Sequence, residues 1–200
     1  GLVAMILLFN GMQGSLSMVY DREMGSMRVL LTSPMPRWFL LISKLLSSTL
    51  LSLAQVYVFL LIAWLYGIQV PPMGYLYVLP ALLLSGMMLG GLGLLLSSMI
   101  KQLENFAGVM NFIIFPMFFT SSALYPLWKV EEASPILRDI CGLNPFTYAV
   151  DVIRFALYGQ FEGVSASVAA ACTIIFVAGA IIAYDPSKGI ITRVRAGAPA

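Results

Sequence analysis

The chain has 200 residues, of which 60% are hydrophobic and only 10% charged, and its net charge is +2. A soluble domain carries about 25% charged residues, so this composition excludes a water-soluble globular protein and predicts an all-α, polytopic membrane protein. The small net charge argues against a nucleic-acid partner. Histidine is absent, which removes the commonest metal ligand and general base, so neither a metal site nor a catalytic residue is predicted.

Five apolar segments are long enough to cross the hydrocarbon core of a bilayer, which takes about 20 residues. They cover approximately residues 1–19, 45–66, 75–100, 106–125 and 164–184. No repeat or low-complexity linker separates them, so we expect one membrane domain over residues 1–200. The chain starts inside an apolar run and without Met, which leads us to expect that at least one earlier span precedes Gly1.

The first span contains Asn10, Gln13 and two glycines, so we expect it to face other helices rather than lipid. The connection after it, residues 20–44, carries a short amphipathic pattern that opens at Asp21. Met24, Met27 and Leu31 fall on one helical face of this pattern. Pro34 and Pro36 end it, because proline removes a backbone donor. A compact helix between two spans is suited to receive a push from a soluble partner.

Basic residues are concentrated in alternate connections, which predicts the orientation of the chain. By the positive-inside rule, the first connection, the third connection and the tail after residue 184 are cytoplasmic. Tyrosine and tryptophan residues then form an outer aromatic belt, and the basic tail is expected to meet anionic lipid headgroups. The basic residues of the three segments expected to be cytoplasmic are Arg22, Arg28, Arg37, Lys44, Lys101, Lys188, Arg193 and Arg195. The outer aromatic residues are Trp64, Tyr66, Tyr75, Tyr77, Tyr125 and Trp128.

The third span carries Gly86, Gly90 and Gly93, a pattern of small residues that allows close helix contact. This contact is either packing within the chain or a seam between two identical chains. In the fourth span, Asn111 is expected either to form an interhelical hydrogen bond or to contact substrate. Pro116 frees a carbonyl group and is expected to kink the helix.

The outer connection, residues 126–163, is too long for a turn. Asn144 and Pro145 are typical of the start of a helix, and Gly159 of its end. The helix between them has about a dozen residues, too few to span, so it would lie at the outer surface or enter the membrane and return. One stripe of this helix is polar, with Asp151 and Arg154 spaced for a salt bridge or a substrate contact. The stripe consists of Thr147, Asp151, Arg154 and Tyr158, and the opposing apolar face of Phe146, Val150, Ile153 and Leu157.

With both connections read, the chain resembles the ABC-2 type permease family, the membrane subunits of a group of ATP-binding-cassette transporters. The resemblance covers nearly the whole chain. Its marks are Arg22-Glu23-x-Gly25-Ser26, Leu30-Leu31-Thr32-Ser33-Pro34, Arg37 and Lys44, and later Asn144-Pro145-Phe146-Thr147-Tyr148 with Asp151 and Arg154.

The resemblance implies six spans in the full protein, a coupling helix that docks on an ATPase subunit, and re-entrant helices in the outer connection. The coupling residues would be Arg22, Glu23, Gly25, Arg28, Leu31, Pro34 and Arg37, although Arg28 stands where many relatives carry an acidic residue. The resemblance also implies export as the direction of transport. The chain would be the permease half of an exporter in a cell membrane, expected to be the bacterial inner membrane. It would pair with an ATP-binding subunit and with an identical or different second permease subunit.

No GxxxxGK[ST] phosphate loop occurs, so the chain itself would carry no cofactor, and ATP and Mg would bind the partner ATPase. The absence of fixed charge within the spans favours a hydrophobic, amphipathic or lipid-linked substrate. Three other hypotheses stay open: a secondary transporter, an intramembrane enzyme and a non-transporting scaffold. The first needs ionisable groups at membrane depth and the second a catalytic constellation. A scaffold leaves the charged cytoplasmic helix unexplained.

Overall fold

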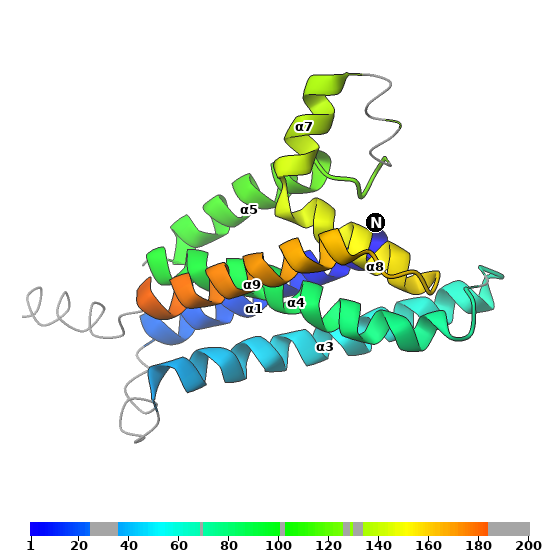
Figure 1. The fold of residues 1–200 in the computed structure, drawn as a ribbon. Helices are drawn as coiled ribbons and strands as arrows, with labels where there is room; N and C mark the ends of the chain where they lie inside the picture. The colour runs from blue at the N-terminus through cyan, green and yellow to red at the C-terminus, as the bar shows by residue number, and fades with distance from the viewer. Residues whose placement is uncertain (25–35, 69, 101–102, 126–128, 130–133, 184–200) are drawn as a thin grey trace, which may run out of the picture.

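The computed structural model describes residues 1–24, 36–68, 70–100, 103–125, 129 and 134–183, without the side chains of residues 22, 23, 37, 103 and 104. This part of the chain is built from helices and contains no strand (Figure 1). Four helices are long and apolar enough to cross a membrane, which confirms the predicted class. The helices are α1 (Leu2–Glu23), α3 (Arg37–Leu65), α4 (Gly74–Met99), α5 (Leu103–Phe119), α7 (Pro135–Leu143), α8 (Pro145–Leu157) and α9 (Gly163–Ala183).

The fourth apolar segment is shorter as a helix than its composition predicts. We expected a span over residues 106–125, but α5 ends at Phe119 and the chain then turns. With 17 residues, α5 is about 25 Å long, slightly less than the hydrocarbon core of a bilayer. Residues 120–125 form a turn in which Thr120 and Ser122 bond to Asn144 and to α8, as described below. Pro116 lies inside α5 and is exposed.

The first two helices extend further into the connection between them than expected. We assigned Asp21 to the start of the coupling helix, but α1 continues through Glu23. Helix α3 begins at Arg37, directly after the prolines predicted to end the preceding helix, and so starts ahead of the apolar span predicted from Leu45. Proline at this place is favourable because a helix start needs no backbone donor there. With 29 residues, α3 is about 43 Å long, which exceeds the thickness of the hydrocarbon core of a bilayer.

Helix α4 is the centre of the bundle and packs against α1, α3, α8 and α9. Leu82, Met88 and Leu89 of α4 are fully buried, together with Leu8 of α1 and Phe146 of α8. These side chains belong to one continuous apolar core that contains residues of all five helices. Helix α7 projects away from the long helices (Figure 1). The bundle therefore has one buried central helix, and the other helices pack on it or on one another.

Glycines let α1 and α3 approach α4 closely. A Cβ atom at Gly11 would lie 2.9 Å from the backbone nitrogen of Gly90, and one at Gly93 would lie 2.4 Å from Ser15 Oγ. A Cβ atom at Gly86 would lie 2.8 Å from a methyl group of Thr49 in α3. The three glycines of the small-residue pattern thus lie at helix contacts within the chain, where atoms of a neighbouring helix occupy the place of a Cβ atom.

Two polar residues of the spans lie differently from what we expected. Asn111 is exposed on α5, and its amide has no hydrogen bond to another residue in the described part of the chain, so the interhelical bond is not formed there and the substrate contact stays a prediction. The reason is that α5 contacts mainly α1, and Asn111 shares the uncovered face with Phe112 and Phe115. Gln13 is exposed on α1, although we expected this helix to face its neighbours. Asn10 is half-buried and pairs with α3.

Candidate functional site

Asn144 joins the start of α8 to the end of α5. Its side-chain oxygen accepts a hydrogen bond from the backbone of Phe146 at 3.0 Å, which caps α8. Its amide nitrogen donates to the carbonyl oxygens of Met117 at 2.6 Å and Thr120 at 3.2 Å. The last carbonyl groups of a helix have no partner within the helix. One buried amide therefore satisfies both helix ends and holds the point at which α5 stops.

A second polar group joins α8 to the turn after α5. Ser122, which is fully buried, donates to Asp151 at 3.0 Å. Arg154 forms an ion pair with Asp151 at 3.4 Å and donates to the backbone oxygen of Ser122 at 2.7 Å. The i, i+3 spacing of Asp151 and Arg154 makes their contact possible on one helix face. Both residues thus bind within the chain.

Two further residues of the Asn-Pro-Phe-Thr-Tyr motif join α8 to α7. Thr147 donates to the backbone oxygen of Cys141 at 2.7 Å, and Tyr148 to that of Gly142 at 2.8 Å. Most of the predicted polar stripe and apolar face of α8 is therefore covered: Arg154 and Leu157 are half-buried, and Tyr158, which follows the helix, is exposed. The chain ends α8 as predicted, since Gly159 has a φ of +70°.

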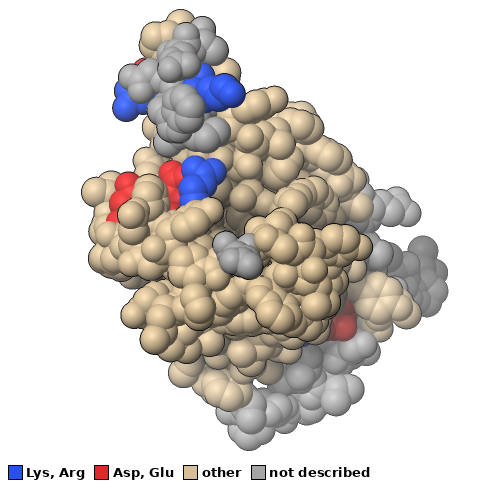
Figure 2. All heavy atoms as spheres, turned by 90° about the vertical axis from the view of Figure 1, so that its right-hand side faces the viewer, with Lys and Arg blue, Asp and Glu red and all other residues tan. Residues whose placement is uncertain are grey.

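We predicted one helix in the outer connection and missed α7. The signal was present as Ser134 followed by Pro135, a frequent start of a helix. Ile136 and Leu143 of this helix are 73% and 84% exposed, so α7 covers little of its own apolar surface. Figure 2 shows this end of the molecule, where the charged atoms gather mainly on one side and most of the face is uncharged.

The predicted coupling segment is described only at its two ends. Gly25, Arg28, Leu31 and Pro34 lie outside the described residues, and so do the side chains of Arg22, Glu23 and Arg37. Lys44 of α3 forms an ion pair with Asp21 of α1, and both are about 30% exposed. This contact joins the helices on either side of the segment. The ion pair holds α1 and α3 close together at the end of the bundle where the segment between them has to connect them.

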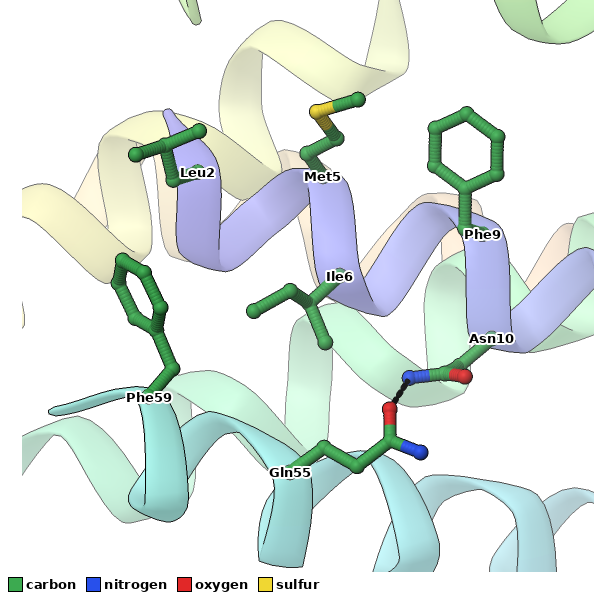
Figure 3. Close-up of a pocket in the computed structure, with 7 residues that line it drawn as sticks. All are labelled: Leu2, Met5, Ile6, Phe9, Asn10, Gln55 and Phe59. Atoms are coloured by element: carbon green, nitrogen blue, oxygen red, sulfur yellow. Dashed lines mark hydrogen bonds between the residues drawn. The ribbon is translucent and has the colours of Figure 1, made fainter. Parts of the chain in front are cut away.

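A groove lies between α1 and α3, nearer to the end of the bundle that carries α8. Its volume is about 390 Å³, and its lining includes Ile6, Phe9, Asn10, Gln55 and Phe59. In Figure 3, Asn10 and Gln55 point toward each other, and Ile6 and Phe59 point into the gap between the two helices. Among the described residues, no group of His, Cys, Asp or Glu is arranged to hold a metal ion.

Comparison of the sequence with known proteins shows the family to which the chain belongs. The sequence pattern of the ABC-2 type transporter family matches residues 1–158, from α1 through α8. The chain belongs to the ABC-2 type transporter family. It is 32% identical over 158 residues to the putative transport permease ycf38 of Cyanophora paradoxa, covering 75% of this chain and 53% of that protein.

Two other relatives of this ABC-2 chain have more specific names. The probable multidrug ABC transporter permease YbhR of Escherichia coli K12 is 31% identical over 157 residues, 76% of this chain and 41% of its own length. Nodulation protein J of Rhizobium leguminosarum bv. viciae is 27% identical over 100 residues, 47% of this chain and 38% of its own. The ABC-2 chain therefore spans about half or less of the relatives that it matches.

The groove of the ABC-2 chain includes a residue that the sequence analysis did not single out. Asn10 was noted as a polar residue within a span, but Gln55 was not, although it is the only amide side chain in α3. A lone amide in an apolar helix is a signal for a polar contact. Its partner is 45 positions away, and no local pattern connects the two.

The buried carboxyl group of Asp151 predicts a pH dependence of stability. Burial raises its pKa, whereas the hydrogen bond from Ser122 and the charge of Arg154 lower it. A carboxyl whose pKa is raised by folding contributes stability below its unfolded pKa, about 4, and loses it as the pH rises through the folded pKa. In the wild-type protein, Asp151 should therefore lower the thermal unfolding temperature in detergent as the pH rises from about 4 to about 7. We expect Asp151→Asn to remove this decrease.

The matched control is Asp139→Asn, which changes an exposed carboxylate on α7. It should keep the wild-type dependence on pH. If Asp151→Asn and the wild-type protein show parallel profiles, Asp151 does not contribute to the pH dependence.

Proposed function

We propose that this chain is the membrane permease subunit of an ATP-driven transporter that exports a hydrophobic, amphipathic or lipid-linked substrate. The observation that carries the proposal is the family match over residues 1–158. The substrate class is supported by charge: residues 2–20, 45–65, 74–99, 105–125 and 163–183 contain no Asp, Glu, Lys or Arg. Secondary transporters usually place such groups at membrane depth, so this distribution favours a neutral route.

In this proposal, a separate ATP-binding subunit binds ATP and Mg and docks on the segment between α1 and α3. Closure of the ATPase subunits would push on this segment and shift the spans between inward-open and outward-open arrangements. The Asp21–Lys44 ion pair supports such a role, because it ties together the two helices that receive the push. A second permease subunit, identical or different, would complete the pathway in a bacterial inner membrane.

The experiment is affinity co-purification of the full-length protein in mild detergent, followed by an ATPase assay. Recovery of a separate ATP-binding subunit with measurable ATP hydrolysis is the expected result. Absence of any ATPase, under conditions that preserve a known complex of this kind, would contradict the proposal and favour a secondary transporter or a scaffold.

Substitutions in the coupling segment should uncouple the two subunits. We expect Glu23→Ala, Gly25→Val or Leu31→Ala to lower ATP-dependent uptake of hydrophobic dyes into inverted vesicles by about tenfold or more, while the protein stays inserted. The reason is that Gly25 and Leu31 lie within the segment proposed to receive the push, and Glu23 is the last residue of α1 before it. Tyr66→Phe is the control, because Tyr66 is 85% exposed at the opposite end of α3. Normal uptake by all three variants would refute the coupling role.

A further inference from the structure

The amide pair in the groove has hydrogen-bonding capacity that the chain does not use. Asn10 Nδ2 donates to Gln55 Oε1. In the described part of the chain, neither Asn10 Oδ1 nor Gln55 Nε2 has another partner. If Gln55 instead donated to Asn10, one amide oxygen and one NH2 group would again be left without a partner. The pair therefore presents a donor and an acceptor side by side.

These groups lie at membrane depth. Asn10 is eight residues after the first residue of α1 and thirteen before its last, which places it about 12 Å and 20 Å from the two ends of the helix. Gln55 is exposed, and Asn10 is half-buried. Lipid tails offer no hydrogen-bonding partner, and free amide groups facing them are unfavourable. The pair is therefore expected to face a molecule with polar groups.

The walls of the groove set the rest of the ligand chemistry. Ile6, Phe9 and Phe59 provide apolar surface next to the amides, and Phe9 is 38% exposed. None of the described residues that line the groove is charged. A charged ligand would lose its hydration without gaining a counter-charge, whereas an uncharged polar group needs only the hydrogen bonds that the amides offer. The volume of about 390 Å³ is within the range of small-molecule sites.

We propose that the groove between α1 and α3 binds an uncharged amphipathic molecule. Its apolar chain or ring would lie along Ile6, Phe9 and Phe59, and its hydroxyl or amide group would bond to Asn10 and Gln55. This inference rests on the proposed function, since the occupant is the molecule being transported. It adds the place of contact and the requirement for a neutral polar group.

The test uses the full-length protein in lipid nanodiscs and two photoreactive probes of equal chain length. One is a diazirine-bearing dodecanoyl ethanolamide, which is neutral and offers a hydroxyl and an amide. The other is the corresponding dodecanoic acid, which offers a carboxylate. We expect the neutral probe to label peptides containing residues 2–10 and 55–59, and the acid to label them much more weakly.

Variants separate the amide pair from general apolar binding. Asn10→Leu combined with Gln55→Leu should reduce labelling by the neutral probe about tenfold, as expected for the loss of hydrogen bonds to the ligand. Gln13→Leu is the matched control, because Gln13 is an exposed amide on the same helix that does not line the groove. It should leave labelling unchanged. The two-probe comparison on the wild-type protein tests the proposal even if the double variant does not fold.

Three results would overturn the inference. The groove peptides could stay unlabelled because a preceding part of the chain or a second subunit fills the groove. The acid could label them as well as the ethanolamide does, or the double variant could label like the wild-type protein. Labelling needs no ATP. If the groove peptides stay unlabelled while an ATPase co-purifies, the ligand site in the groove is refuted and the proposed transporter function is not. If the groove peptides are labelled but no ATPase co-purifies, the ligand site in the groove stands and the ATP-driven transporter is refuted.

Discussion

Replacing Gly11 with alanine is expected to destabilise the bundle by about 2 kcal/mol, because the new methyl group meets backbone and not a side chain. The Cβ atom would lie 2.9 Å from the nitrogen and 3.1 Å from the Cα atom of Gly90. These atoms belong to the central helix and move only if α1 and α4 separate. Separation opens gaps around Leu8 and Leu89, which are fully buried. Thermal unfolding in detergent, with the yield of monodisperse protein, measures the effect.

Two other glycines provide graded controls for Gly11→Ala. At Gly90, the added Cβ atom would lie 2.6 Å from a terminal methyl group of Leu45, which is able to rotate away, so Gly90→Ala should be milder. At Gly108 in α5, no atom lies within 4 Å of the added Cβ, and alanine should stabilise the helix by up to about 1 kcal/mol. The expected order of stability is Gly108→Ala, then Gly90→Ala, then Gly11→Ala. An equal effect at Gly11 and Gly108 would contradict close contact of α1 with α4.

Asn144→Asp is expected to destabilise the protein by about 3 kcal/mol, although aspartate is as good a helix cap as asparagine. The substitution keeps the oxygen that accepts from Phe146. It replaces the amide nitrogen, which lies 2.6 Å from the carbonyl oxygen of Met117, with a second oxygen that repels it. Asn144 is 8% exposed, so water would compensate little for the lost bonds. The measurement is thermal unfolding in detergent at neutral pH.

Asn144→Ser is the matched variant, since serine also caps helices but is too short to replace the bonds to α5. It should cost less than Asn144→Asp, because it brings no charge to the carbonyl oxygens. Acidification should partly restore Asn144→Asp, because a protonated carboxyl group donates a hydrogen bond to a carbonyl. If Asn144→Asp is as stable as the wild-type protein, the contact between α8 and the end of α5 contributes nothing.

The sequence alone predicted the features that depend on near neighbours in the chain. Runs of about twenty apolar residues identify membrane spans because each spanning helix satisfies its own backbone hydrogen bonds. In the same way, Asn144 and Pro145 marked the start of α8, and Gly159 its end, since capping and positive φ involve only a few adjacent residues. The helical class, the short outer helix and the membership of the family were all accessible at this level.

Only the tertiary structure decided which polar groups meet. The end of α5 is an example: Asn144, which lies 24 positions after Thr120, donates to the backbone oxygen of Thr120 directly after the helix has ended. The contacts of Lys44 with Asp21 and of Asn10 with Gln55 likewise join different helices. Hydropathy along the chain records whether a segment prefers lipid, but it does not record which helix face is covered. That depends on how closely two backbones approach, and in this protein Gly11 and Gly90 set the approach of α1 to the central helix.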